Sequence, residues 1–471
     1  DLYQSYNNGT PFQVTVLNTP LRVQEDLNMN LGFYVQDTWN LNRLTLNYGL
    51  RWDYYSPSSE KYDRLAFFDP DGVNPSAGGR QGRLAYAGDG WGEASYGARY
   101  PERDWYGGLA PRLGLTYAIN NKTLVRAGWG IFYDRAFIPG WGAGMSQDGF
   151  NSNVSFSSSL NGSQPAFNIQ NGFPQDYTPP PFISSDFRNG QGLMYRTLDG
   201  NERPRSQQWN LTIDREIAQG FTLGLAYVGS HGERVPSSNE PLNAIDPQYL
   251  SLGDQLNAEF QPGMTSLNGV PLPYAGWVEQ MTSCAPTVAQ ALRPYPQYCD
   301  NLQGLNENYG TSDYHSLQAK LEKRFSGGTY FLVSYTLGRI YTSGADNTQR
   351  DALTWNSASG SMSPFEQDRN RALATDDVNH VLSAALVWDV PVGKGKKYMD
   401  TGGAANAILG GWQLSTIFRY SSGIPFFFRS SYCNVPGQFR AACIPSMGGN
   451  IFAQDFDNLD VAKPIFNQGA F

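Results

Sequence analysis

The chain has 471 residues, which would allow roughly three soluble domains at about 150 residues each. Only 16% of the residues are charged, against about 25% in an ordinary soluble protein, while 14% are aromatic and 51 are glycine. This composition is typical of β structure with large loops, and the net charge of −8 argues against nucleic acid as a partner. No stretch approaches about 18 consecutive apolar residues, which excludes a transmembrane helix but not a membrane β-barrel, whose strands need only alternate.

Residues 43–55 carry the clearest strand pattern. Apolar side chains occupy every second position, and polar residues or glycine fill the positions between them. Residues 31–39 form a second candidate strand, and only Asn40, Leu41 and Asn42 separate the two, so a tight hairpin is predicted. The alternating apolar residues of the second strand are Leu44, Leu46, Tyr48, Leu50, Trp52 and Tyr54.

The same hairpin pattern recurs along the chain and predicts eleven strands. A short strand at 12–18 comes before the first hairpin, and a last pair has a longer connection rich in glycine and lysine. The remaining predicted strands are 109–119, 123–134, 205–217, 221–230, 312–325, 329–342, 377–390 and 411–421.

The connections alternate strictly between short and long. Four turns have three residues each, whereas the stretches 56–108, 135–204 and 231–308 have 53, 70 and 78 residues. Outer-membrane barrels have this asymmetry, with short periplasmic turns and long external loops, and soluble sandwiches do not. We therefore predict an all-β, antiparallel transmembrane barrel with long extracellular loops, located in the outer membrane and in contact with its lipid.

Aromatic residues stand at both ends of the predicted strands, as an interfacial girdle requires. Trp39 and Phe325 lie beside short turns, and Trp52, Tyr54 and Tyr133 lie beside long loops. On the opposite face of the strands, polar side chains are predicted to line the lumen, where they would contact a ligand or pair across strands. These lumen candidates are Arg51, Asp53, Arg126 and Asp134.

Several segments resemble the barrel of Oar-like TonB-dependent receptors. They include Phe33-Tyr-Val-Gln-Asp-Thr-Trp39 and the strand at 43–55, then Ala110-Pro-Arg-Leu-Gly-Leu-Thr-Tyr117. The segments 314–325, 377–395, 411–415 and 422–425 follow in the family's order, so the resemblance covers nearly all of residues 12–471.

The resemblance implies an outer-membrane transporter of about 22 strands. Such a protein has a lumenal plug and an N-terminal box that contacts the TonB complex, and this sequence shows neither of them. We therefore expect residues 1–471 to be a partial barrel domain from a longer chain, since half a barrel would leave unpaired strand edges in lipid.

The four cysteines fall into two closely spaced pairs on the external side. Cys284 and Cys299 lie in one long loop, and Cys433 and Cys443 follow the last predicted strand. Even counts at short spacing in an oxidising compartment predict two disulfides, with free thiols as the alternative.

Ligand candidates gather in the long loops. Aromatic faces beside arginines could bind a sugar, a peptide or a chelate, although such residues also pack loops on one another. The candidates are Trp91, Tyr96, Arg99, Tyr100, Arg103, Trp105 and Trp141.

Enzyme and cofactor signals are poor. The histidines lack the spacing of a catalytic triad, and no cofactor, catalytic residue or metal site is predicted. Asp69-Pro-Asp-Gly72 has oxygen ligands for calcium, but a solvated acidic turn is the favoured interpretation.

We therefore predict a protein that binds a solute with its external loops and imports it with TonB energy. A surface adhesion or structural barrel without transport is one alternative, and a soluble extracellular carbohydrate-binding β-protein is another. The sequence does not identify the solute.

Overall fold

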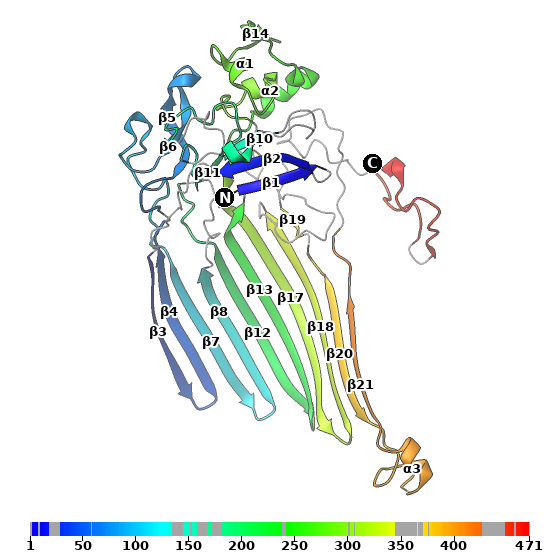
Figure 1. Cartoon of the computed structure of the whole chain (residues 1–471). Helices are drawn as coiled ribbons and strands as arrows, with labels where there is room; N and C mark the ends of the chain where they lie inside the picture. The colour runs from blue at the N-terminus through cyan, green and yellow to red at the C-terminus, as the bar shows by residue number, and fades with distance from the viewer. Residues whose placement is uncertain are drawn as a thin grey trace.

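A computed structural model describes residues 2–7, 10–17, 29–57, 59–133, 145–150, 153–157, 167–171, 181–196, 198–237, 242–299, 302–305, 307–343, 365, 371–374, 376–400, 402–425, 448–455 and 458–470. One large antiparallel sheet dominates it (Figure 1). Ten long strands lie side by side in chain order, and the two-residue strand β19 (Ala372–Leu373) pairs with β18. The ten strands are β3 (Asn30–Leu41), β4 (Leu44–Tyr55), β7 (Leu109–Asn120), β8 (Thr123–Tyr133), β12 (Arg205–Ala218), β13 (Phe221–Ser237), β17 (Glu307–Ser326), β18 (Thr329–Ser343), β20 (His380–Asp389) and β21 (Gln413–Ser421).

The prediction of an all-β antiparallel protein is confirmed, and ten of the eleven predicted strands form this sheet. The strand predicted at 12–18 also forms, as β2 (Thr10–Leu17). It pairs instead with β1 (Leu2–Asn7) and β10 (Asn153–Ser157) in a separate sheet. The prediction that this strand belongs to the large sheet, which forms the wall of the barrel, is therefore wrong. The sequence of a short strand does not specify which sheet the strand joins.

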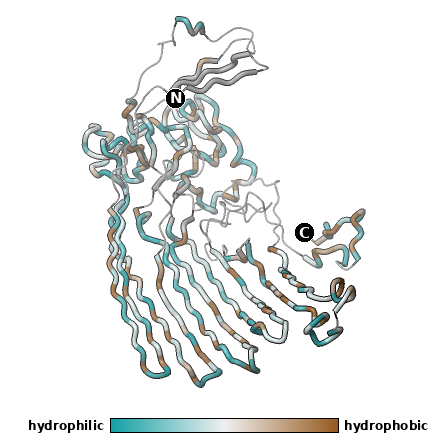
Figure 2. Tube along the Cα trace, turned by 60° about the horizontal axis from the view of Figure 1, so that its bottom comes forward, coloured by the Kyte–Doolittle hydropathy of each residue, from teal (hydrophilic) through white to brown (hydrophobic). Residues whose placement is uncertain are grey.

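The register gives the large sheet one apolar and one polar face. Tyr227 on β13 pairs with Leu317 on β17, which pairs with Leu337 on β18. One residue along, Ala226 pairs with Gln318, and Gln318 pairs with Thr336 on the other face. Because side chains alternate between faces, the apolar face continues across all ten strands, although β20 also carries Val381, Ala385 and Val387 on its other face. Figure 2 shows hydrophobic and hydrophilic positions interspersed along the strands.

The long loops fold at one end of the sheet into a body that we call the external module. It comprises the described parts of 59–108, 145–150, 181–204 and 242–305, and it contains β5 (Ala66–Asn74), β6 (Arg80–Tyr86), β9 (Met145–Ser146), η5 (Pro247–Asn257), α1 (Trp277–Gln280) and α2 (Val288–Ala291). The side chains of Trp277, Tyr86, Tyr298 and Phe68 are buried in its core. The short turns and α3 (Ala404–Leu409) lie at the opposite end (Figure 1).

The three short α-helices of the described residues lie outside the sheet. None of the helices in the described part of the chain is long and apolar enough to cross a membrane.

Candidate functional site

Three loop segments of the external module meet around Gly190, and we call this contact the three-segment crossing. The Gly190 amide donates to the Gln297 carbonyl at 2.7 Å, and the Gly190 carbonyl accepts from the amides of Thr282 and Ser283 at 3.2 and 3.0 Å. A disulfide joins Cys284 to Cys299 beside this crossing, with an S–S distance of 2.11 Å. The other predicted pair, Cys433 and Cys443, lies outside the described residues.

Four of the predicted ligand residues pack or pair within the module. The Trp91 ring lies edge-on to Phe150 with centroids 5.0 Å apart, and its indole N–H donates to the Ala87 carbonyl at 2.8 Å. Tyr96 packs edge-on against Phe67, and Arg99 forms an ion pair with Asp63 at 2.6 Å. Burial raises the pKa of both Tyr96 and Tyr100 above the ordinary value. Trp91 and Tyr96 therefore contribute to the packing of the module, and Arg99 forms an ion pair at its surface.

Two further candidates lie nearer the sheet. Arg103 is 71% exposed and stands 3.8 Å from Asp199, so its guanidinium is accessible to a solute. The Trp105 ring packs on Tyr133 with centroids 5.3 Å apart, and the register places Tyr133 on the apolar face of the sheet. Trp141 lies outside the described residues. Of the described loop candidates, Arg103 is thus the most open to solvent.

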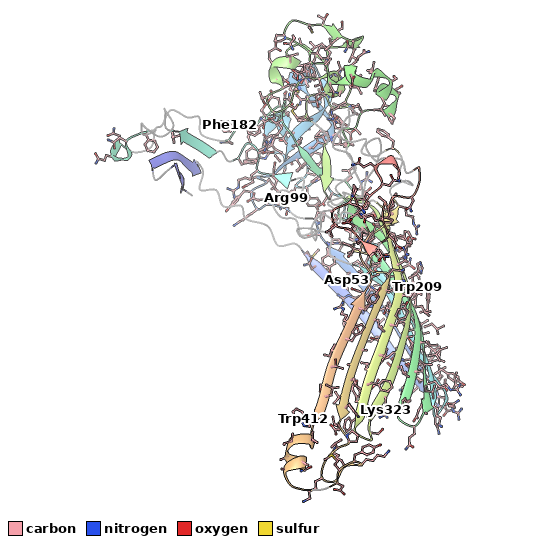
Figure 3. The ribbon with its side chains drawn as sticks, turned by 90° about the vertical axis from the view of Figure 1, so that its right-hand side faces the viewer. Asp53, Arg99, Phe182, Trp209, Lys323 and Trp412 are labelled. Carbon is pink, nitrogen blue, oxygen red and sulfur yellow. A yellow bond between two sulfur atoms is a disulfide. The ribbon has the colours of Figure 1, made fainter. Side chains whose placement is uncertain are left out.

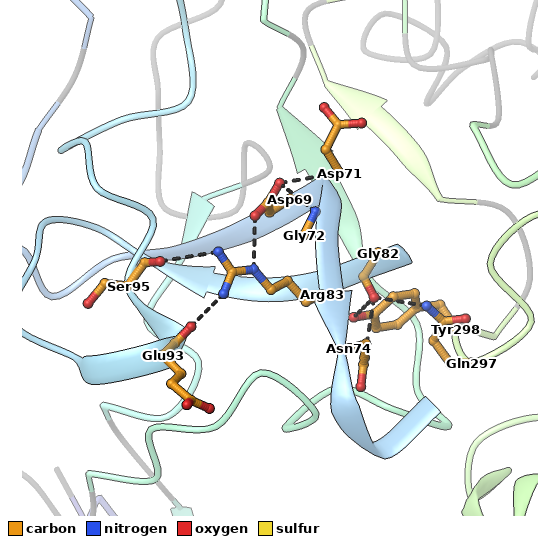
Figure 4. Close-up of polar contacts among 10 residues, drawn as sticks. All are labelled: Asp69, Asp71, Gly72, Asn74, Gly82, Arg83, Glu93, Ser95, Gln297 and Tyr298. Carbon is orange, nitrogen blue, oxygen red and sulfur yellow. Dashed lines mark hydrogen bonds and ion pairs between the residues drawn. The ribbon is translucent and has the colours of Figure 1, made fainter. Parts of the chain in front are cut away.

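The acidic turn at Asp69 is a structural element (Figure 4). One oxygen of the Asp69 carboxylate accepts from the amides of Asp71 and Gly72 at 3.3 and 3.2 Å, and the other accepts from Arg83 at 2.9 Å. Asp71 is exposed, as expected for a solvated acidic turn, whereas Asp69 is only 8% exposed and is held inside the module. Within the described residues, no group of three His, Cys, Asp or Glu side chains could hold a metal ion.

Three of the predicted lumen residues fall on the polar face of the sheet and pair there. Arg51 forms an ion pair with Asp53 at 2.6 Å, and Arg126 forms one with Asp214 of the neighbouring strand β12. Asp134 lies outside the described residues. The ion pairs neutralise these charges on the polar face.

A hollow of about 420 Å³ opens in the sheet among β3, β4, β7, β8 and β12. Most of its lining belongs to the polar face, where glycines leave space and amide side chains stand around them. Arg112 lies over the Phe132 ring at 4.6 Å and has no carboxylate partner among the described residues. The polar-face lining residues are Gln36, Thr38, Asn47, Gly49, Arg112, Gly114, Gly128, Gly130, Phe132, Gln208 and Asn210.

Sequence reasoning missed this hollow. The signal was present, because Gly114, Gly128 and Gly130 all occupy alternate positions on the polar side of their strands. Such a hollow can hold a polar solute by hydrogen bonds from amides and from Arg112.

Comparison with known proteins identifies the family. A family model described as "Outer membrane beta barrel domain" matches residues 3–471. The chain belongs to this family. The protein therefore resides in the outer membrane. In barrels of this kind the apolar side of the strands faces lipid and the polar side faces the lumen. The assignment also agrees with the prediction that the chain is not an enzyme.

Solved structures of low overall similarity accompany the family match. The FrpB iron transporter from Neisseria meningitidis shares 10% identity at a TM-score of 0.32, over 77% of this chain and 30% of that one. The alcaligin outer-membrane receptor FauA from Bordetella pertussis shares 10% at 0.30, over 83% and 42%. The ferripyoverdine receptor from Pseudomonas aeruginosa shares 12% at 0.31, over 82% and 28%.

This chain thus spans less than half the length of those three chains. No curated protein matches it. The family assignment rests on the family model.

Proposed function

We propose that the chain forms part of the wall of an Oar-like TonB-dependent transporter that imports a solute across the outer membrane. The observation that carries this proposal is the glycine-lined hollow on the polar face of the sheet. The same sheet bears the folded external module at its outer end (Figure 1). The external module would capture the solute, and the polar lumenal face would receive it. The exposed guanidinium of Arg103 is the candidate contact in the module, and Arg112 is the candidate contact in the hollow.

The edges of the sheet support a larger wall. Within the described residues, β3 pairs only with β4, and β21 pairs only with β20. Each unsatisfied backbone group in lipid costs several kcal/mol, so both edges need partner strands in the membrane. We propose that further strands, from a longer polypeptide with its own plug and TonB contact, complete the barrel.

The experiment compares solute depletion from growth medium by cells that carry the full gene and by cells that lack it. Mass spectrometry of the medium identifies any solute that disappears faster with the gene. Import with TonB energy predicts that this difference vanishes when a protonophore collapses the inner-membrane proton gradient.

A matched pair of variants tests the hollow. A Cβ at Gly114 meets only ordinary contacts, the nearest being Asn47 Cβ at 3.6 Å, and we expect the ring of Gly114→Phe to fill the hollow. Leu115→Phe, one residue along the same strand, adds its bulk on the lipid-facing side. We expect depletion to fall at least tenfold with Gly114→Phe and to remain unchanged with Leu115→Phe.

Equal depletion with and without the gene would contradict a transport role. If cells carrying the gene then attached more strongly to surfaces or to other cells, the adhesion alternative would replace it.

A further inference from the structure

All three histidines of the chain lie on the lipid-facing side of the wall at one height. His231 is ten residues beyond Phe221, the lower end of β13, and His315 is eleven residues before Ser326, the lower end of β17. His380 is nine residues before Asp389, the lower end of β20. Their cross-strand partners, Asp313, Gly229 and Leu337, belong to the apolar register.

This height corresponds to the outer edge of the lipid bilayer. A strand rises about 3.3 Å per residue, and at a tilt of about 40° it climbs roughly 2.5 Å per residue along the membrane normal. Nine to eleven residues therefore reach roughly 25 Å above the lower turns, which is about the height of the apolar band of a barrel. Figure 3 shows Trp209, nine residues from the lower end of β12, near the top of the strands and Lys323 near the bottom.

Arg339 lies at the same height as the three histidines, and we call these four residues the histidine belt. It is ten residues beyond Thr329 on β18, directly opposite His315 in the register, and its side chain is exposed. Its Nε donates to the Asn379 side-chain oxygen at 3.2 Å, and it has no carboxylate partner among the described residues. A guanidinium at the edge of lipid is costly unless an anion or water meets it.

Two supporting networks hold the donors of this belt in place. The Asn379 amide nitrogen contacts His380 Nε2 at 3.0 Å, and His380 Nδ1 shares a hydrogen bond with the Tyr335 hydroxyl at 2.7 Å. On the other side, His315 Nδ1 shares a hydrogen bond with the Tyr227 hydroxyl at 2.8 Å. Within the described residues, His315 Nε2 and the terminal nitrogens of Arg339 have no hydrogen bond or ion pair.

Two carboxylates near the belt have cationic partners. Asp313 contacts His231 at 2.6 Å and Arg371 at 3.4 Å. Glu233 contacts Arg205 at 2.5 Å and His231 at 3.4 Å. The carboxylate of Asp377, also nearby, accepts a hydrogen bond from the Ile340 amide at 2.8 Å and is buried, and no ion pair joins it to Arg339.

We propose that Arg339 and His315 bind the phosphate headgroup of a lipid of the outer leaflet. The planar guanidinium offers two parallel donors to phosphate oxygens, and the exposed edge of His315 adds a third. Tyr227 and Trp209 pack beside His315, and Tyr335 packs beside His380. Amphipathic rings prefer the depth where the acyl chains begin. The site is independent of the solute pathway, because it lies on the opposite face of the wall.

The experiment uses the full-length protein purified from outer membranes in detergent. The probes are diphosphorylated lipid A and the same lipid after enzymatic removal of its phosphates, and native mass spectrometry measures the fraction of protein with bound lipid. We expect the phosphorylated lipid to bind and Arg339→Gln to weaken that binding about tenfold, the loss of one charge-assisted pair. Arg339→Lys, which keeps the charge, should restore part of the binding.

Arg215→Gln is the matched control. Arg215 is exposed on the same face, but it lies three residues from Ala218 at the lower end of β12, and it has no ion pair among the described residues. Its loss should leave lipid A binding unchanged, and the altered gel migration of the unboiled protein verifies that each variant folds. Equal binding of the two lipid forms, or equal losses in Arg339→Gln and Arg215→Gln, would overturn the proposal.

Discussion

Gly190→Ala should unfold the external module while leaving the wall intact. Gly190 has a φ of 73°, in the left-handed region, and a Cβ at this position would stand 1.6 Å from the Gln280 carbonyl oxygen. The left-handed conformation costs a residue with a Cβ about 1–2 kcal/mol. The backbone must also move apart, which weakens the three hydrogen bonds that Gly190 makes to Gln297, Thr282 and Ser283, each contributing about 1 kcal/mol. The expected loss is therefore about 3–5 kcal/mol.

Two other glycines separate the cost of the left-handed conformation from the cost of the steric clash. Gly192 has no positive φ and open space around it, so Gly192→Ala should change stability by less than about 0.5 kcal/mol. Gly269 has a φ of 80° and open space, so Gly269→Ala should lose only the conformational part, about 1–2 kcal/mol. The expected loss of module stability therefore increases from Gly192→Ala to Gly269→Ala to Gly190→Ala.

Brief proteolysis at increasing urea concentration measures this ranking on the protein in outer-membrane vesicles. Cleavage in the module reports its unfolding, because lipid shields the strands. If Gly190→Ala resisted protease as well as Gly192→Ala, the three-segment crossing would not hold the module together.

Three further predictions concern the same module. Replacing Cys284 and Cys299 together by serine should cost up to about 3 kcal/mol, as expected for a crosslink with a sequence separation of 15, and the same proteolysis measures it against the parent protein. Trp91→Ala should cost about 2–3 kcal/mol through lost packing, whereas Arg103→Ala should cost less than about 0.5 kcal/mol; equal costs would show that the packing of Trp91 contributes nothing. Burial raises the pKa of Tyr86 to about 12, so its stabilising contribution is complete below pH 10 and is lost as the pH rises to about 12, by up to about 3 kcal/mol. Tyr86→Phe should flatten the dependence of module stability on pH in that range, and an unchanged slope would contradict the assignment.

The wall could be predicted from the sequence because its information is local. The alternation at 43–55 and the three-residue turn before it gave β3 and β4 to within about two residues at each end. A period of two fixes both the strand and its faces, and Tyr227, Leu317 and Leu337 then follow from the register.

The external module could not be predicted, because its contacts are distant in sequence. Asn74 donates to Asn189 at 2.8 Å, and Gln297 donates to the Gly82 carbonyl at 2.8 Å, across more than a hundred residues in each case. The loops have no periodicity to signal such contacts. The sequence around an aromatic residue such as Trp91 does not distinguish a residue that packs on a neighbour from one that faces a ligand.

The sequence analysis missed the histidine belt for a related reason. His315 and Arg339 stand on the face that alternation marks as apolar, where a polar residue looks like an exception. Their height above the lower turns, at the outer edge of the bilayer, is what suggests a contact with lipid headgroups.

The most direct test of the central claim is a pair of fluorescent labels on β17. Leu317→Cys places a label on the face assigned to lipid, and Gln318→Cys places one on the face assigned to the lumen. The parent protein treated with the same reagent supplies the background. Brominated lipids should quench the label at 317 and leave the label at 318 unaffected. Equal quenching at both positions, or quenching at 318 alone, would contradict the assignment of the two faces.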